Sequence, residues 1–472
     1  MEPHSEYRQE QASRQTGKTF RNLGARAHPL GKAAGVAFLI LCLMIPLSFI
    51  ERQIHSRQSY QNQVIREIAS SAASSQVVVG PILSIVYWTK TPETPHYDTK
   101  TGTVITQAAR TNKHFVVVPA RKLAIKGGTR VERRYRGIYQ ARLFNLDAEV
   151  EGAFVIPADL IKIPDGDTLI EARAAILFGI SDLRGLNSDP DVKINGKTFY
   201  FRPPNDKNFE NVIGGNRLEI DLGAWTPGES RTMAFSFPLK LTGTETLSIA
   251  PTAENNLVEL TSDWQHPSFQ GRFLPSKRTI KKTGFTAQWE ISQLARNLEK
   301  SLEGKNYSGG EILSIDFMDP VNIYLQAERA VKYGSLFIVL TFAAFFIGET
   351  LRRRPMHLMQ YALVGLSLAI FFLLLIALSE HLPFAYAYLT GAIACVGLIS
   401  IYLAGAFNSK STAFSFGSAL SVLYGMLYGI LQMEDMALLM GSLLLFAALA
   451  AVMLSTRRLD WYQLKQGDAN SH

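Results

Sequence analysis

Apolar residues gather in two parts of the chain, a short run near the N-terminus and most of the last third. The first run, AAGVAFLILCLMIPLSFI, covers residues 33–50 without a charged residue. It is just long enough to cross a hydrocarbon core about 30 Å thick. We predict a transmembrane helix here, kept as a signal anchor, because no A-x-A-like cleavage site follows directly.

Five further apolar segments of spanning length follow in the last third, separated by short polar connectors. They cover approximately residues 333–347, 357–379, 383–404, 413–431 and 436–454. The pattern predicts a bundle of five transmembrane helices within residues 331–455, which makes six spans in all.

Lysine and arginine beside these spans predict the orientation. Basic residues occur in the N-terminal tail (residues 1–32, predicted to be disordered), in the connector RRRP at residues 352–355, at Lys410 and in the C-terminal tail (residues 456–472). The connectors at residues 379–384 and 432–435 carry none. Because basic flanks stay in the cytoplasm, we expect both termini there and residues 51–330 on the other side.

The middle of the chain changes its period. Residues 51–75 keep helical spacing and extend the first span as a juxtamembrane helix. Residues 76–320 contain short β-prone runs separated by turn residues, and Asn195 with Gly196 gives the strongest hairpin signal in the chain. This pattern predicts a large, mainly β domain that resembles an antiparallel sandwich. A late helix is expected at residues 291–303.

Composition changes this picture little. Hydrophobic residues make up 47% and charged residues 19% of the 472 residues, which is more apolar than a soluble protein needs. The formal net charge of +8 is explained by the basic membrane flanks, so no nucleic-acid partner is expected. Both cysteines, Cys42 and Cys395, lie in apolar segments. We expect no disulfide framework, no metal site and no cofactor.

The sequence shows no catalytic motif. His55, His96, His114 and His266 form neither an HExxH motif nor a close pair, and no G-x-S-x-G motif is present. Glu349 ends a span beside the RRRP connector, which favours an interfacial ion pair over a proton-relay site. We expect a protein that is not an enzyme, although a triad assembled only by folding stays open.

Small residues recur every four positions along the fifth span, at Gly417, Ser421, Gly425 and Gly429. Such a face lets another helix backbone approach closely. Two partners fit it. We favour a neighbouring helix of the same bundle, because that partner is present in the chain; the alternative is the same helix of a second copy, which would form a homo-oligomer.

Residues 262–273, SDWQHPSFQGRF, place Trp264, His266, Phe269 and Phe273 among small polar residues. These four residues predict a ledge that binds a glycan or a peptide, such as a cell-wall fragment. The alternative is that the aromatic rings belong to the core while Pro267 shapes a turn. We favour the alternative, because large aromatic side chains in β domains are usually buried.

Several segments resemble one known family. SDWQHPSFQGRFLPSKRTI, GFTAQWEISQLARN, VGPILSIVY, QAERAVKYGSLFIVLTFAAFF and HLMQYALVGLSLAIFFLLLIALSEHLPFAYAYLTGAIACV are similar to the inner-membrane protein CreD family, also called cell envelope integrity proteins. The resemblance implies a multi-pass protein of a Gram-negative inner membrane, with residues 51–330 in the periplasm. It also implies expression within a two-component regulon and a link to envelope integrity, colicin tolerance and the β-lactam response. It implies no defined catalytic residues.

We therefore expect a non-enzymatic protein that supports envelope integrity in a stress response. Its expected partners are the lipid bilayer and, for the periplasmic domain, peptidoglycan fragments or envelope proteins. A transporter or lipid-handling protein is the first alternative, although the spans hold almost no ionisable group at depth. A membrane-tethered cell-wall hydrolase is the second. It requires His266 or His114 within hydrogen-bond reach of a serine and a carboxylate.

Overall fold

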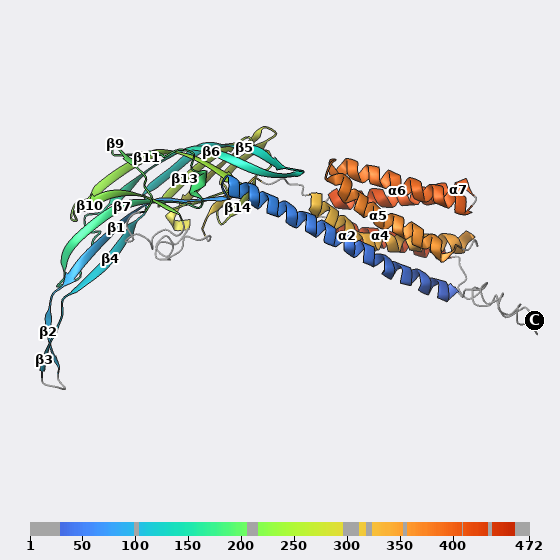
Figure 1. Ribbon diagram of the computed structural model, residues 1–472, viewed down its shortest axis with the longest axis horizontal. Coiled ribbons are helices and arrows are strands. Elements are labelled where there is room, and N and C mark those ends of the chain that lie inside the picture. Colours follow the sequence, from blue (N-terminus) through green and yellow to red (C-terminus); the bar gives the residue numbers. More distant parts are fainter. Residues whose placement is uncertain are drawn as a thin grey trace, which may run out of the picture. The chain divides into compact units, whose positions relative to one another are not determined.

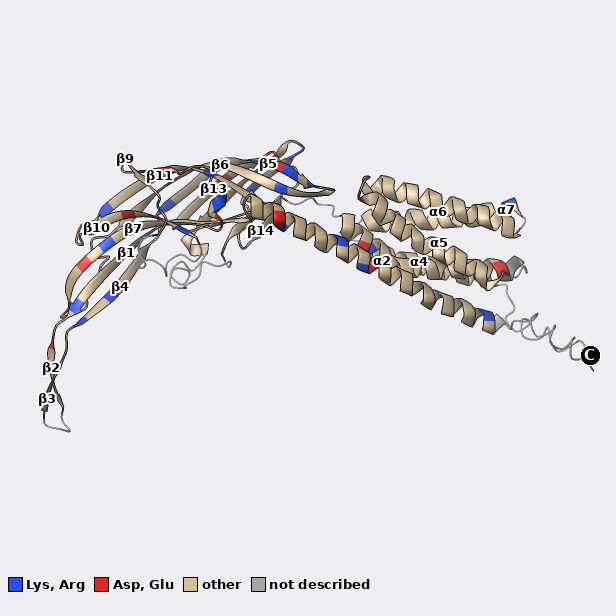
Figure 2. Cartoon of the chain, viewed as in Figure 1, with Lys and Arg blue, Asp and Glu red and all other residues tan. Residues whose placement is uncertain are grey.

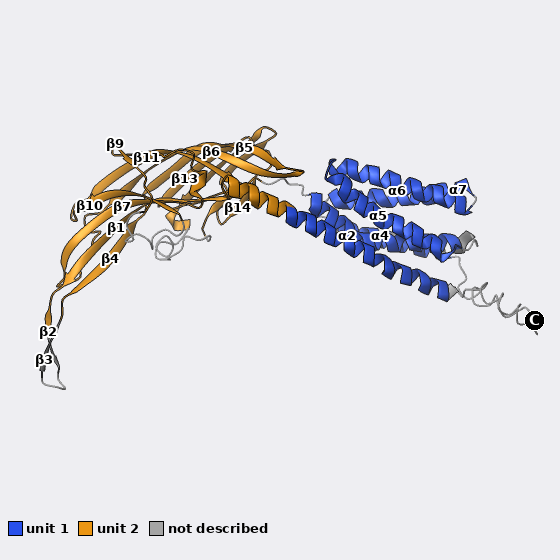
Figure 3. Ribbon diagram, viewed as in Figure 1, with its two compact units in different colours: residues 1–60, 321–472 blue, residues 61–320 orange. Residues whose placement is uncertain are grey.

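The computed structural model describes residues 29–98, 103–204, 216–295, 311–317, 323–352, 356–407, 409–432 and 437–457. Its contacts divide the chain into two compact units (Figure 3). The helical unit comprises Met1–Tyr60 and Val321–His472, and the β-rich unit comprises Gln61–Pro320.

The elements follow one another in a simple order: an N-terminal helix, strands, then helices (Figure 1). They are α2 (Pro29–Ser71), β1 (Gln76–Thr91), β2 (Thr94–Asp98), β3 (Thr103–Gln107), β4 (Arg110–Val118), β5 (Lys122–Arg136), β6 (Tyr139–Ile156), β7 (Thr168–Ile180), η1 (Leu183–Gly185), β8 (Asp191–Ile194), β9 (Lys197–Tyr200), β10 (Arg217–Ala224), β11 (Arg231–Thr244), β12 (Thr246–Ala250), β13 (Asn255–Ser262), β14 (Ser268–Gly271), β15 (Lys277–Lys281), β16 (Gly284–Ser292), η3 (Gln293–Ala295), β17 (Leu313–Asp316), α4 (Ile323–Arg352), α5 (Leu358–Ser379), α6 (Phe384–Phe407), α7 (Lys410–Gln432) and α8 (Ala437–Thr456).

The N-terminal helix α2 is much longer than a membrane span. It has 43 residues, which corresponds to about 65 Å at about 1.5 Å per residue, whereas about 20 residues suffice to cross a bilayer. Its apolar residues lie in the first half and its polar residues in the second. The prediction that a helix continues beyond the first apolar run is confirmed.

Among the described residues, five helices are long and apolar enough to cross a membrane: α2, α4, α5, α6 and α7. The sixth helix, α8, is also apolar, but its described apolar part, Leu439–Leu454, is shorter. Lys, Arg, Asp and Glu are missing from α5 and α6, as Figure 2 shows. The apolar composition therefore suits a hydrocarbon environment over the length of these helices.

The strands of the β-rich unit form two large sheets and one small hairpin in the described part of the chain. One sheet has seven strands in the order β10-β7-β1-β12-β17-β14, with β4 also paired to β1, and the other has eight in the order β15-β16-β13-β5-β6-β11-β8-β9. The expected β-prone runs are strands, and the predicted turn joins β8 to β9 with Asn195 at φ 47° and Gly196 at φ 82°.

The pairing differs from the expected antiparallel arrangement at two places. β1 pairs with β12 in parallel, and β5 pairs with β13 in parallel. Both pairs join strands that lie far apart in sequence, so no hairpin turn links them. Between β11 and β12, Glu245 has a backbone φ of 63°, and the chain passes here from the eight-stranded to the seven-stranded sheet. Because the chain changes sheets here and forms no hairpin, the direction of the next strand is not forced to reverse.

One hydrophobic core joins the inner faces of the two sheets. Ile85 and Ile176 belong to it from the seven-stranded sheet, and Phe144 and Phe237 from the eight-stranded sheet. The ring of Phe178 on β7 meets that of Phe237 edge-on, with 5.3 Å between centroids. On the eight-stranded sheet, strands such as β11 alternate and place exposed side chains on the opposite face, where a ligand can reach them. On the seven-stranded sheet, β1 is buried on both faces, and its residues Val79, Ile82 and Val86 belong to a second apolar cluster.

The late helix expected at residues 291–303 is wrong where the structure describes it. Ile291 and Ser292 end strand β16, and Gln293–Ala295 form a single 3-10 turn. Residues 296–303 lie outside the described part of the chain. Ile291 is buried in the core, which explains why an apolar residue here follows strand alternation and not the helical period.

Candidate functional site

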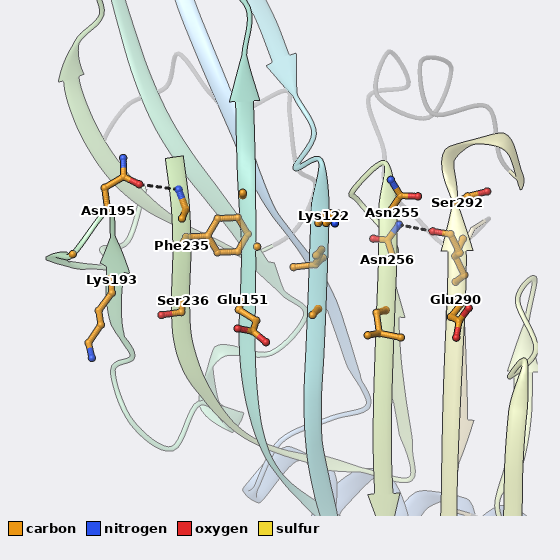
Figure 4. A pocket seen from close by; sticks show the side chains of 18 residues that line it. Lys122, Glu151, Lys193, Asn195, Phe235, Ser236, Asn255, Asn256, Glu290 and Ser292 are labelled. Carbon is orange, nitrogen blue, oxygen red and sulfur yellow. Dashed lines mark hydrogen bonds between the residues drawn. The ribbon is translucent and has the colours of Figure 1, made fainter. Parts of the chain in front are cut away.

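A hollow of about 1000 Å³ lies on the eight-stranded sheet (Figure 4). We call it the trough. Residues of strands β5, β6, β8, β11, β13 and β16 and of the β8–β9 turn line it: Lys122, Leu123, Ala124, Glu151, Gly152, Ala153, Lys193, Asn195, Gly196, Ala234, Phe235, Ser236, Asn255, Asn256, Leu257, Glu290, Ile291 and Ser292.

The strand register arranges the outward side chains of the trough in two rows across the sheet. The first row runs Ser292, Asn255, Lys122, Ala153, Ala234, and the second runs Glu290, Leu257, Ala124, Glu151, Ser236, Lys193. The small side chains of Ala124 on β5, Ala153 on β6 and Ala234 and Ser236 on β11 leave the hollow open, because larger side chains at these positions would fill it.

Glycine at position 152 allows close packing beneath the trough. A Cβ atom on Gly152 would lie 2.4 Å from the carbonyl oxygen of Lys122 and 2.5 Å from the ring of Phe235. The ring of Phe235 is buried and can therefore cross under β6 only while residue 152 lacks a side chain.

Two asparagines hold the end of the trough in place. The backbone N–H of Ala234 donates to Asn195 Oδ1 at 2.9 Å, which ties the β8–β9 turn to β11. Asn256 is buried, and its Nδ2 donates to the carbonyl oxygens of Ala253 at 2.7 Å and Ile291 at 3.2 Å. The trough is therefore built on fixed strands rather than on long loops.

The charges around the trough have both signs. Lys122, Lys193, Glu151 and Glu290 are exposed, and Ser236 separates Glu151 from Lys193 in the second row. Two strand spacings put this carboxylate and this ammonium group about 9–10 Å apart at their backbones. Such a surface can bind an extended polar molecule that itself carries amino and carboxylate groups.

The structure places the aromatic segment away from the trough. Trp264 is 8% exposed and belongs to the core, and its Nε1 donates to the carbonyl oxygen of His266 at 3.0 Å. Phe269 and Phe273 are half-buried and pack against the same core. His266 is exposed. Ligand binding by these four residues stays a prediction, and the burial of the Trp264 ring favours the packing alternative.

A hydroxyl on β1, a histidine on β4 and a carboxylate just before β7 do meet elsewhere. The hydroxyl of Thr89 donates to Asp167 Oδ2 at 2.8 Å and lies 3.0 Å from His114 Nε2. Hydrogen bonds from Thr91 and Thr89 hold the pKa of Asp167 below its usual range. The ring of Tyr87 stacks on His114 at 4.9 Å between centroids.

The order of these hydrogen bonds differs from that of a hydrolase triad. Thr89 has a single hydroxyl proton, and Asp167 accepts it, so His114 Nε2 must be the donor toward Thr89. In a triad the histidine accepts the proton of the nucleophile, and the carboxylate holds the other ring nitrogen. The network of Thr89 therefore fixes the fold and does not activate a nucleophile.

Of the predicted packing residues on α7, Gly417 packs within the bundle. A Cβ atom on Gly417 would lie 2.4 Å from Ser400 Oγ on α6, and Ser421 Oγ donates to the Gly417 carbonyl oxygen at 2.8 Å. Cβ atoms on Gly425 and Gly429 would meet nothing within 4 Å. The homo-oligomer through this helix stays a prediction.

Among the described side chains, Glu349 meets a lysine and a tyrosine; the side chains of the expected partners, Arg352 to Arg354, lie outside the described part of the chain. Glu349 forms an ion pair with Lys32 of α2 and accepts a hydrogen bond from the Tyr361 hydroxyl at 2.9 Å. At the other end of α5, Glu380 accepts a hydrogen bond from the Tyr324 hydroxyl at 3.2 Å and lies 3.7 Å from Arg57 Nε. Charged groups therefore join α2 to the other helices at two levels.

The trough was missed by the sequence analysis. Its signal is present in the outward positions of three strands, where Ala124, Ala153, Ala234 and Ser236 are small. The signal is readable only after the strands are known to be neighbours. β11 and β5, for example, both pair with β6 although β5 and β11 are far apart in sequence.

Comparison with known proteins gives a consistent picture over most of the chain. The model of the family described as inner membrane protein CreD matches residues 28–462. The inner membrane protein CreD of Escherichia coli (strain K12) is 33% identical over 428 residues, which cover 90% of this chain and 91% of that protein.

Two similar solved structures show weak likenesses to this chain. The M1 zinc metallopeptidase of Deinococcus radiodurans shares 10% identity over 42% of this chain and 42% of its own, with a TM-score of 0.21. A putative nutrient binding protein of Legionella pneumophila shares 10% identity over 46% of this chain and 82% of its own, with a TM-score of 0.20. TM-scores this low carry no argument about fold or activity.

Proposed function

Because the chain belongs to the inner membrane protein CreD family, we propose that it is a non-enzymatic, multi-pass inner-membrane protein that supports the integrity of the cell envelope. Its β-rich unit binds an envelope component, and its helices anchor that unit in the membrane. Its expression follows a two-component response to envelope or β-lactam stress. The family and the five helices that are long and apolar enough to cross a membrane support the membrane part of this proposal.

The β-rich unit faces the periplasm and both termini face the cytoplasm in this proposal. Lys32 precedes the apolar part of α2, Lys410 begins α7, and Arg457 follows α8. With α8 as a sixth span and successive helices alternating in direction, these basic residues come to one side, and basic residues favour the cytoplasmic side. The strands between α2 and α4 then lie on the opposite side.

The trough carries the binding part of the proposal. Its floor is lined by small side chains, and exposed charges of both signs surround it. This surface suits a peptidoglycan fragment, because the peptide stems of peptidoglycan carry amino and carboxylate groups. The glycan part can donate and accept hydrogen bonds with Asn255 and Ser292 at one end of the first row. The trough is open to solvent along its length, which suits binding without enclosure of a reacting bond.

The test is direct binding of soluble muropeptides to the full-length protein in lipid nanodiscs, followed by isothermal titration calorimetry. We expect saturable binding and no new product by chromatography. The change Ala234→Trp fills the trough from an exposed position on β11, and it should weaken binding about tenfold or more, a loss of about 1.4 kcal/mol.

Lys240→Trp is the matched control. Lys240 lies on the same strand and the same outward face but outside the trough, so its replacement should leave binding within about twofold. Absence of binding to the folded wild-type protein would contradict the proposed ligand. Equal losses in both variants would show that the trough is not the site.

The two alternative functions receive less support from the described residues. A hydrolase needs a base that accepts the proton of the nucleophile, and His114 donates to Thr89 instead. A transporter commonly holds ionisable groups at depth, and α5 and α6 contain no Lys, Arg, Asp or Glu.

A further inference from the structure

A groove of about 770 Å³ runs along the exposed surface between α6 and α7. Two faces line it, Ala385 to Gly397 on α6 and Ser421 to Tyr428 on α7. Both helices are apolar enough to cross a membrane, so the groove faces either lipid or another protein within the bilayer. The trough of the β-rich unit has no part in it.

The floor of the groove is hydrocarbon in character. Tyr388 and Tyr424 are buried, and both hydroxyls are already bonded: Tyr388 donates to the Tyr424 carbonyl oxygen at 2.7 Å, and Tyr424 donates to Cys395 Sγ at 3.1 Å. The two tyrosines therefore offer ring carbons to the groove. Neither hydroxyl proton is left to donate to a polar ligand.

Small residues make the groove deep, and large residues make its wall. A Cβ atom on Gly425 would meet nothing within 4 Å, and Ala392 is a small lining residue on α6. Tyr386, Leu389 and Ile393 are 65%, 57% and 65% exposed and form the α6 side. Large side chains on one wall prevent the close backbone approach that a small-residue helix contact requires.

The length of the groove matches one leaflet. Ala385 and Gly397 are twelve residues apart on α6, which corresponds to about 18 Å of helix, and half of a hydrocarbon core of about 30 Å is about 15 Å. Since α6 begins at Phe384, the groove starts near one membrane surface and ends near the midplane.

Polar groups lie at the surface end of the groove. Tyr386 is exposed at the start of α6, and the hydroxyl of Tyr428 accepts a hydrogen bond from Gln432 Nε2 at 2.8 Å near the end of α7. Tyrosine is typical of the membrane–water interface, where its ring lies in the apolar layer and its hydroxyl near the headgroups.

From its leaflet length, apolar floor and single polar end, we infer that the α6–α7 groove holds one acyl chain of a phospholipid, whose headgroup lies beside Tyr386 and Tyr428. The bound lipid fills the space that the small residues of α6 and α7 leave open. It stabilises the contact between these helices as a structural lipid and is not transported.

The experiment uses the full-length protein in nanodiscs that contain phosphatidylethanolamine with a photoactivatable diazirine in its acyl chain. Cross-linked residues are mapped by mass spectrometry of peptides. We expect cross-links to concentrate on groove residues such as Tyr388 and Tyr424, above those on the exposed face of α6 around Ile401, which is 76% exposed. Equal yields on both faces would overturn the inference.

Filling the groove supplies the matched comparison. Gly425→Leu should reduce groove cross-links about tenfold, because leucine occupies the space of the acyl chain. A tenfold loss corresponds to about 1.4 kcal/mol of lipid-binding free energy. Gly405→Leu is the control, since a Cβ atom there also meets nothing within 4 Å but the position lies outside the groove. An unchanged yield in Gly425→Leu would contradict the inference.

A second copy of the chain is the competing occupant. Cross-links between two chains at groove residues, or a dimer in nanodiscs that Gly425→Leu dissociates, would overturn the lipid assignment. Ala392→Phe fills the groove from the α6 side and should reproduce the Gly425→Leu result, which guards against an effect of the α7 substitution on folding.

Discussion

At the residue scale, Asp182 holds the chain where it leaves α2 and enters the first strand. Its Oδ2 accepts hydrogen bonds from the Ser74 backbone N–H at 3.0 Å and from Arg184 Nη2 at 2.6 Å. Gln76 Nε2 donates to the Asp182 carbonyl oxygen at 3.0 Å. The bonds from Arg184 and Ser74 hold the pKa of the Asp182 carboxyl well below its usual range, so it stays ionised.

We expect Asp182→Asn to loosen this junction. Amides from Ser74 to Val77 should exchange with deuterium about tenfold faster or more in the full-length protein, because a hydrogen bond to a charged group contributes about 1.5–3 kcal/mol. Asp191→Asn, at an exposed carboxylate on β8, is the control and should not change this exchange. Equal exchange in the Asp182 variant and the wild type would contradict the assigned role.

The same carboxylate gives a pH dependence of known sign. A pKa that folding lowers stabilises the folded state above the unfolded pKa of about 3.9, and this contribution is lost as pH falls through the lower folded value. Protection at Ser74–Val77 should therefore decline as pH falls below about 4 in the wild type. It should decline less in Asp182→Asn.

Whether the role of a residue could be predicted from the sequence depends on how far along the chain its partners lie. Asn195 and Gly196 were predictable, because the turn they form is local and needs a positive φ at both positions. Asp182 was not, because its partner Ser74 is 108 positions away. For Trp264 the sequence allowed both a ligand-binding role and a place in the core. The structure buries its ring, with Arg133 and Arg142 over it, and these contacts join segments far apart in sequence.

At the element scale, two charge clusters bracket the membrane part of α2. Lys32 pairs with Glu349 near one end, and Arg57 lies beside Glu380 farther along. These 25 positions of helix correspond to about 38 Å, which is longer than a hydrocarbon core of about 30 Å and shorter than the 40–45 Å that include the headgroups. Both clusters therefore fit the headgroup layers, where charges are tolerated.

We expect Glu349→Gln to lower the thermal unfolding temperature of the detergent-solubilised protein, because it leaves the half-buried ammonium group of Lys32 without its charge partner. The double variant Lys32→Met with Glu349→Gln should recover part of the loss, since it removes the unpaired charge. Losses that simply add in the double variant would show that the pair is not coupled.

Elements differ in how far the sequence determines them. Apolar runs predicted the helices well, because length and hydropathy act within one segment. Strand pairing was less accessible: β1 and β12 lie side by side in parallel although they are far apart in sequence and no turn links them. The trough depends on pairings of this kind, such as that of β5 with β13. Its floor therefore could not be predicted from the sequence, which does not show which strands are neighbours.

At the scale of the whole molecule, the proposed orientation decides whether the trough can meet peptidoglycan at all. His381 lies exposed between α5 and α6, and Ser411 lies exposed in the first turn of α7. We expect a cysteine at position 381 to react with a membrane-impermeant maleimide in intact spheroplasts. A cysteine at position 411 should react only after permeabilisation, because Lys410 beside it favours the cytoplasm.

The wild-type protein gives the background of this labelling, since Cys395 is buried and Cys42 lies half-buried in the apolar part of α2. Labelling of the position 411 variant in intact spheroplasts would reverse the orientation and place the strands between α2 and α4 in the cytoplasm. The trough would then be cut off from the cell wall. The expected pattern instead puts the trough and peptidoglycan in one compartment, which peptidoglycan binding by the full-length protein requires.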